Sequence, residues 1–143
     1  MTSQSDVKNA IVGSWHLITL RAELMDEGGT AYPMGKDARG IITYSPNGYM
    51  AVQLMPSATT KAKSTIHDIL AYTGRYWTEV QSDGRMIVKQ QMEMCTQPDL
   101  EGSTQQRIVT ISENQMELAS PAFFPFKGVM QKPVLLWQRI EES

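Results

Sequence analysis

The sequence predicts an all-β protein in which eight antiparallel strands form an up-and-down barrel, preceded by a short N-terminal helix. Short runs rich in Val, Ile, Thr, Tyr and Trp recur along the chain and are separated by turn-forming residues. No long helical pattern lies between these runs, which argues against alternating strands and helices. Trp15 enters the first run and Arg139 leaves the last. Because a closed barrel pairs its first and last strands, we expect the Arg139 guanidinium to stack on the Trp15 indole at one closed end.

The chain begins with a helical segment that leads directly into the first strand. Residues 6–12 can form one or two helical turns, with Ser5 or Asp6 as the N-cap. Residues 14–24 then read as a long strand. Asp26-Glu27-Gly28-Gly29 ends it, because glycine and acidic residues favour turns.

The remaining strands pair as hairpins, and the last one returns to the first. Asn-Gly between two apolar runs is a strong hairpin signal. A polar loop is expected over residues 56–63 and a helical turn, capped by Ser64, over residues 64–68. The last strand begins at Val129 or Pro133 and runs to Ile140. The predicted hairpins are 39–45 with 49–55 across Pro46-Asn47-Gly48, 69–80 with 86–95 across Ser82-Asp83-Gly84, and 104–111 with 116–120 across Glu113-Asn114-Gln115.

The first strand carries apolar residues on both faces. If Trp15 faces the lumen, the period of two places Leu17, Thr19, Arg21 and Glu23 on the same side. The opposite face, with His16, Ile18, Leu20 and Ala22, is then the more apolar one. Either a bulge shifts the alternation, or a second copy of the chain covers this face in a homodimer.

Composition and charge argue against several classes of partner. The chain has 13 basic and 15 acidic residues, a net charge of −2 and no basic stripe, which argues against nucleic acid and membrane surfaces. The N-terminus is polar, and Cys95 is the single cysteine, so we expect a cytoplasmic protein without a disulfide. His16 and His67 are far apart in the sequence, and no glycine-rich nucleotide motif occurs. We therefore expect neither a metal site nor a cofactor.

Several segments resemble one known family. They are residues 32–55 (YPMGKDARGIITYSPNGYMAVQLM), residues 72–76 (YTGRY), Gly13-x-Trp15 and Leu136-Trp137-x-Arg139. On these motifs the chain resembles the bacterial and fungal lipocalin-like domain family over nearly its whole length. The resemblance implies one lipocalin-like barrel domain over residues 1–143. Some related barrels act on natural-product intermediates.

Polar residues on strands that line an apolar lumen are the candidates for chemistry. The predicted catalytic residues are Tyr72, Arg75 and Glu93, and Arg107 is a further polar lumen candidate. Arg75 and Glu93 can instead form a surface pair across two strands, and the tyrosines can be core rings. The predicted ligand-binding residues are Tyr44, Gln53, Met92, Met94, Phe124 and Trp137.

Two functions follow from a small barrel with such a lumen. The first is an enzyme that folds a small hydrophobic metabolite into a reactive shape and converts it without a cofactor, by cyclisation, isomerisation or dehydration. The second is a non-catalytic carrier for the same class of molecule. The proline-broken aromatic segment 120–126 is expected either to cap the mouth of the barrel or to pack on its outer wall.

Overall fold

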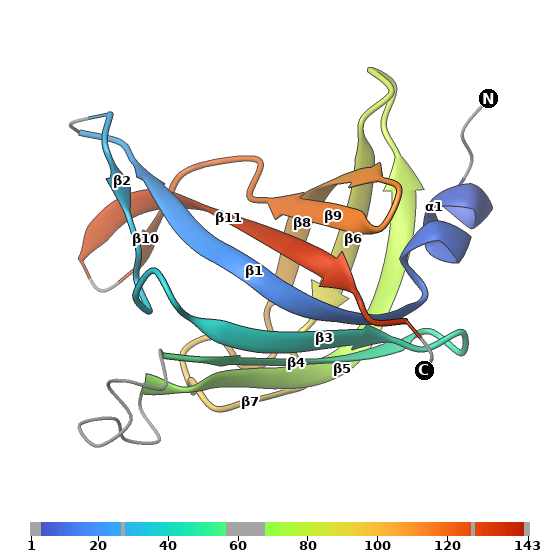
Figure 1. The fold of residues 1–143 in the computed structure, drawn as a ribbon, viewed down its shortest axis with the longest axis horizontal. Helices are drawn as coiled ribbons and strands as arrows, with labels where there is room; N and C mark the ends of the chain where they lie inside the picture. Colours follow the sequence, from blue (N-terminus) through green and yellow to red (C-terminus); the bar gives the residue numbers. More distant parts are fainter. Residues whose placement is uncertain (1–3, 27, 57–67, 127, 142–143) are drawn as a thin grey trace.

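A closed antiparallel barrel forms the body of the molecule (Figure 1). The structure, a computed structural model, describes residues 4–26, 28–56, 68–126 and 128–141. Its elements are α1 (Gln4–Ile11), β1 (Gly13–Leu24), β2 (Thr30–Ala31), β3 (Arg39–Tyr44), β4 (Tyr49–Met55), β5 (Leu70–Val80), β6 (Met86–Gln91), β7 (Met94–Cys95), β8 (Thr104–Ser112), β9 (Gln115–Ala119), β10 (Phe124–Phe126) and β11 (Val129–Arg139). Within this part of the chain, eight strands close a ring in the order β1-β3-β4-β5-β6-β8-β9-β11, and β11 pairs with β1. The predicted eight-stranded barrel with a short helix is therefore confirmed.

The first and last strands are joined by the stacked pair that the sequence predicts. Trp15 lies directly opposite Arg139 in the β1–β11 ladder, and the guanidinium carbon is 4.1 Å from the centroid of the indole ring. The same guanidinium donates hydrogen bonds from Nη1 to Val12 O (3.0 Å) and from Nη2 to Ala10 O (2.5 Å). The indole Nε1 donates to Ile11 O at 3.0 Å. The pair therefore closes the barrel and also satisfies carbonyl groups at the end of α1.

A bulge in β1 resolves the ambiguity of the first strand. The register with β11 shifts between Leu17 and Thr19, so the alternation reverses at this point. Trp15 is buried before the shift, and Leu20 and Ala22 are buried after it. The apolar residues on both halves of β1 thus face the interior without a partner chain. The apolar residues of β1 therefore give no reason to expect a partner chain, and the homodimer stays a prediction.

A second irregularity splits the strand that the sequence predicts over residues 86–95. Tyr76 pairs with Gln90, and Thr73 pairs with Met94, so an advance of three residues on β5 faces an advance of four on the other side. The extra residue ends β6 at Gln91 and starts β7 at Met94. One uninterrupted strand over residues 86–95 is therefore a wrong prediction.

Gly74 makes room for this bulge. A Cβ atom added to Gly74 would lie 1.9 Å from the carbonyl oxygen of Gln91 and 3.0 Å from the amide nitrogen of Glu93. Only a residue without a side chain allows the two backbones to approach so closely. Gly74 therefore determines where the alternation of β6 changes.

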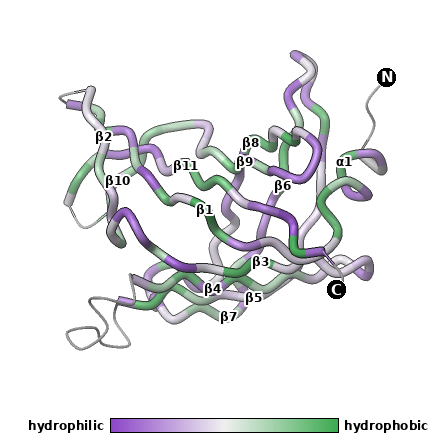
Figure 2. Tube along the Cα trace, viewed as in Figure 1, coloured by the Kyte–Doolittle hydropathy of each residue, from purple (hydrophilic) through white to green (hydrophobic). Residues whose placement is uncertain are grey.

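The turns and the strand faces follow the sequence closely. The predicted hairpins appear as β3–β4, β5–β6 and β8–β9, and Gly48 and Gly84 adopt φ of 90° and 89° in their turns. Exposed and buried residues alternate along β4, and Figure 2 shows both hydrophobic and hydrophilic stretches on the barrel strands. The loop predicted over residues 56–63 and the helical turn predicted over residues 64–68 fall largely on residues 57–67, which lie outside the described residues. In the described part of the chain, no helix has the length and hydropathy needed to cross a bilayer.

Replacing Arg139 by Ala should lower the free energy of unfolding by about 1–3 kcal/mol, because the stack and two hydrogen bonds to the helix end are lost. Arg139→Lys should restore only part of this loss, because an ammonium group has no planar fork. Urea denaturation of the three proteins measures the effect. Equal stability of Arg139→Ala and the wild type would show that the stack does not hold the barrel closed.

Replacing Gly74 by Ala should cost about 3 kcal/mol or more, because the new methyl group meets a backbone carbonyl that cannot rotate away. Gly29→Ala is the matched control, since a Cβ at Gly29 meets nothing within 4 Å. Thermal denaturation of both variants measures the difference. Two variants of equal stability would contradict the close contact between β5 and the β6–β7 bulge.

Candidate functional site

A mostly apolar pocket lies inside the barrel. It encloses about 860 Å³ of space, including the part that opens to solvent. Its wall draws on strands all around the ring and on residues near the mouth. The apolar part of the wall is formed by Leu20, Pro33, Met34, Ile42, Leu54, Leu70, Met92, Leu100, Leu118, Phe124, Phe126, Pro133, Leu135 and Trp137, and the polar part by Tyr72, Gln90, Gln105, Arg107 and Gln131.

Most of the polar groups come from one side of the barrel, where β5, β6 and β8 are neighbours. The hydroxyl of Tyr72 donates a hydrogen bond to Gln90 Oε1 at 3.3 Å. The amide Nε2 of Gln90 donates in turn to the hydroxyl of Tyr44, on β3. Tyr44 and Gln90 are both buried, so each satisfies a group of the other that would otherwise be unpaired. The three side chains form a continuous hydrogen-bonded chain along the wall.

Burial keeps the two tyrosines of this chain protonated. Burial raises the pKa of Tyr44 well above its usual value, and the neighbouring Tyr72 adds to this effect. Burial also raises the pKa of Tyr72, and the positive charge of Arg107 opposes this increase. Because the phenolate forms are disfavoured, neither hydroxyl acts as a base near neutral pH. The Tyr72 hydroxyl donates to Gln90, and the Tyr44 hydroxyl accepts from it.

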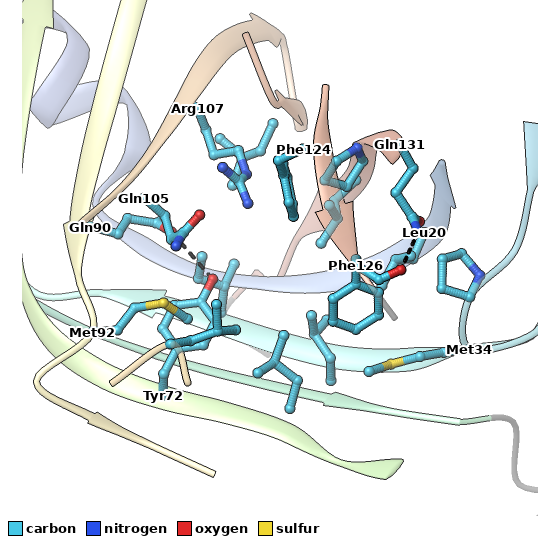
Figure 3. A pocket seen from close by; sticks show the side chains of 18 of the residues that line it. Leu20, Met34, Tyr72, Gln90, Met92, Gln105, Arg107, Phe124, Phe126 and Gln131 are labelled. Carbon is cyan, nitrogen blue, oxygen red and sulfur yellow. Dashed lines mark hydrogen bonds between the residues drawn. The ribbon is translucent and has the colours of Figure 1, made fainter. Parts of the chain in front are cut away.

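Arg107 brings a positive charge into the pocket. It extends from β8 into the space between Phe124 on one side and Gln90 and Gln105 on the other (Figure 3). Its Nη1 donates to the carbonyl oxygen of Gln106 at 2.8 Å, and its guanidinium carbon lies 6.0 Å from the centroid of the Phe124 ring. Burial lowers the pKa of the guanidinium, but an arginine at neutral pH stays charged even so.

Two aromatic residues of segment 120–126 line the pocket, while the expectation that this segment caps the mouth stays a prediction. Phe124 and Phe126 belong to β10, which pairs with β11, and both line the pocket. Gln131 anchors this edge strand by donating from Nε2 to Phe126 O at 3.1 Å (Figure 3). Phe123 does not line the pocket, and its ring lies beneath the ammonium group of Lys132.

The structure brings part of the predicted site together. Tyr72, Met92, Phe124 and Trp137 all lie in the pocket wall. Tyr44 lies behind the wall, where it accepts the hydrogen bond from Gln90. Trp137 is fully buried, and its indole Nε1 has no hydrogen-bond partner among the described residues. The binding and catalytic roles of these residues stay predictions.

The other predicted site residues face outward. On β4 the inward positions are Met50, Val52 and Leu54, so Gln53 is exposed, and the expectation that it points into the lumen is wrong. Although the residues around Gln53 are apolar, they alternate regularly between the inner and the outer face of β4. An amide in such a run needs no ligand when it faces solvent.

The remaining three lie around the β5–β7 contact. Arg75 is exposed on β5 and donates from Nε to the Tyr49 hydroxyl at 3.2 Å, a contact that raises the pKa of the guanidinium. Glu93 is exposed because it lies on the face opposite Met92, and Met94 is exposed because the extra residue after Gln91 reverses the alternation. Placing Arg75, Glu93 and Met94 at the pocket is therefore a wrong prediction, and the bulge is the physical reason for Met94.

Several pocket residues were not among the predicted site residues. Gln90 lies two positions before Met92 and therefore shares its face, and Gln131 shares a face with Leu135 and Trp137 in the same way. The period of two along a strand was therefore enough to predict that both glutamines face the pocket. Gln105 lies two positions before Arg107 on the same predicted strand, so the same signal applied to it.

The pocket wall offers donors and one positive charge but no conventional base. Among the described residues that line it, none is a carboxylate, an imidazole or a thiol. No group of three or more His, Cys, Asp or Glu side chains that could hold a metal ion occurs in the described ranges. The arrangement can hold an apolar molecule and polarise or neutralise an oxygen atom on it.

Comparison with known proteins supplies the family. Searches among curated proteins and among solved structures found no match. The family model of the lipocalin-like domain matches residues 12–140, which include every strand of the closed barrel. The chain therefore belongs to the lipocalin-like domain family.

Proposed function

We propose that the barrel binds one small, mostly apolar molecule in its pocket and converts it without a cofactor. The observation that carries the proposal is the pocket itself, an apolar enclosure with its polar groups concentrated on one wall. Apolar contact contributes about 25 cal/mol per Å² of buried surface but does not orient a ligand. The donors on β5, β6 and β8 supply the orientation.

Cyclisation and isomerisation are the reactions that suit this wall. Both can be promoted by shape, exclusion of water and polarisation of a carbonyl oxygen. Arg107 has free donors for this purpose, and Tyr72 would donate to the ligand by turning its hydroxyl proton away from Gln90. A dehydration needs a group that removes a proton, and the described wall offers no carboxylate, imidazole or thiol for that step. We therefore favour conversions in which the protein donates hydrogen bonds and holds the reactive conformation.

The alternative is a carrier that binds the same class of molecule and leaves it unchanged. The hydrogen-bonded chain of Tyr44, Gln90 and Tyr72 favours an enzyme only weakly, because such a chain can also serve orientation alone. Binding and conversion therefore need separate experiments.

Replacing Leu135 by Trp should weaken binding of the neutral dye N-phenylnaphthylamine by about tenfold or more, because the larger ring occupies pocket space. Leu136→Trp is the matched control, since Leu136 is the next residue on β11 and does not line the pocket. Titrations followed by the fluorescence of the dye measure both affinities. Failure of the wild-type protein to bind the dye, or equal loss in the two variants, would contradict binding inside the barrel.

The purified protein, incubated with a small-molecule extract of cells, should change the chromatographic retention of one metabolite without changing its mass. Cyclisation and isomerisation both leave the mass unchanged, and mass spectrometry detects the new species. Tyr72→Phe should slow the change by about tenfold or more while binding persists, because a donor to the reacting oxygen is lost. Retention of a bound metabolite in unaltered form would favour the carrier.

A further inference from the structure

No acidic residue in the described part of the chain forms an ion pair with Arg107. Among the described residues, the ion pairs are Arg85 with Asp83 and Lys89 with Glu79. Arg107 is also the charged residue of the described pocket wall, where apolar side chains predominate. Arg107 is half-buried. A charge partly removed from water without a counter-ion carries a desolvation cost, so a guanidinium at this position calls for a physical explanation.

The hydrogen bonds of Arg107 leave most of its donors free. A guanidinium has five N–H donors, arranged as a planar fork. One of them is used by the backbone carbonyl of Gln106, at 2.8 Å, and the described residues accept no further hydrogen bond from this side chain. The nearby Phe124 ring, 6.0 Å away, attracts the cation but accepts no proton. The fork therefore retains donors on the side that faces the pocket (Figure 3).

The groups around Arg107 do not neutralise its charge. The ionisable side chains that act on it are Tyr72 and Tyr44, and burial keeps both protonated by raising the pKa of each hydroxyl. Gln90 and Gln105, which line the same part of the wall, are neutral amides. The polar side of the pocket consequently combines a net positive charge with hydrogen-bond donors, a combination that suits an anionic oxygen group.

We infer that Arg107 binds an anionic oxygen group of the ligand. The pocket would then select apolar molecules that carry one acidic oxygen group, such as a carboxylate or an enolate, over neutral apolar molecules. The inference rests on the proposed function, because it assigns the ligand class of the same pocket. An oxyanion against the free face of the fork would supply both the missing counter-charge and the acceptors for the remaining N–H groups.

A purely structural role for Arg107 is the competing explanation. In that case the side chain would tie β8 to β10 through Gln106 O and the Phe124 ring. Removing it would then destabilise the protein and weaken all ligands alike. A ligand-binding role predicts weaker binding of anionic ligands alone and no loss of stability. The reason is that a half-buried charge without a counter-ion carries a desolvation cost in the free protein, and its removal relieves that cost.

Two dyes with the same ring system separate these explanations. N-phenylnaphthylamine is neutral, and anilinonaphthalene sulfonate carries one added sulfonate. The variants are Arg107→Met, which removes the charge, and Arg107→Lys, which keeps it without the fork. Arg75→Met is the matched control, because it removes one positive charge from the exposed outer face of β5. Fluorescence titrations give the four affinities for each dye, and thermal denaturation gives the stability of each protein.

We expect Arg107→Met to weaken binding of the sulfonate dye by about tenfold or more, as loss of a charge-assisted hydrogen bond implies. Binding of the neutral dye should change by less than about twofold, Arg107→Lys should be intermediate for the sulfonate dye, and Arg75→Met should match the wild type. The midpoint of denaturation of Arg107→Met should not fall below that of the wild type.

The two proposals fail in different ways. If the wild-type protein binds neither dye, the proposed function is contradicted together with the ligand class. If the neutral dye binds but Arg107→Met weakens both dyes equally, or weakens neither, the assignment of Arg107 alone is overturned. A lower midpoint of denaturation for Arg107→Met, with both affinities reduced, would establish the structural role instead.

Discussion

The contact between Trp15 and Arg139 is the constraint on which the rest of the barrel depends. It joins two residues at opposite ends of the chain, and it places them in register across the β1–β11 ladder. The same arginine binds the carbonyl groups of Ala10 and Val12, so the helix, the first strand and the last strand meet at one closed end. From there the ladder runs to Leu24 and Gln131, at the end where β2 and β10 lie. The pocket occupies the space between these two ends.

The sequence predicted the barrel because closure, turns and alternation leave readable signals. Asn47-Gly48 marked a hairpin, and the early tryptophan and late arginine marked the closing strands. The signals end where the backbone departs from a period of two. The bulge near Ile18 and the extra residue after Gln91 both reverse which face is inward. The first bulge is reflected in the apolar residues on both faces of β1, whereas the residues beside the second irregularity carry no such pattern. Gly74 is the nearest hint, because a glycine within a strand often permits a close backbone approach.

The same limit explains which candidate residues reach the pocket. Tyr72 lies beyond the second irregularity, where β5 pairs with β7, and it still lines the pocket because the extra residue is on the other strand. Met92 shares the face of Gln90 and lines the pocket before β7 begins. Met94 follows the extra residue and is exposed. The prediction that Gln53 faces the lumen is wrong for another reason. It relied on the apolar neighbours of Gln53, whereas the alternation of β4 places this residue on the outer face. Position within a regular strand was the better guide than the local contrast in polarity.

Arg139 at the closed end and Arg107 in the pocket differ in how many partners they have within the chain, and this difference gives the pocket its positive charge. Near the closed end, Arg139 is compensated by a ring and two carbonyl oxygens, so its charge contributes to the fold. In the pocket, Arg107 has one carbonyl oxygen and one ring, and the residues beside it are themselves donors. Two arginines of the same barrel thus differ in how fully their donors are used within the chain. A fold that is closed elsewhere can tolerate an incompletely compensated charge, and in the proposal above a group of the ligand completes it.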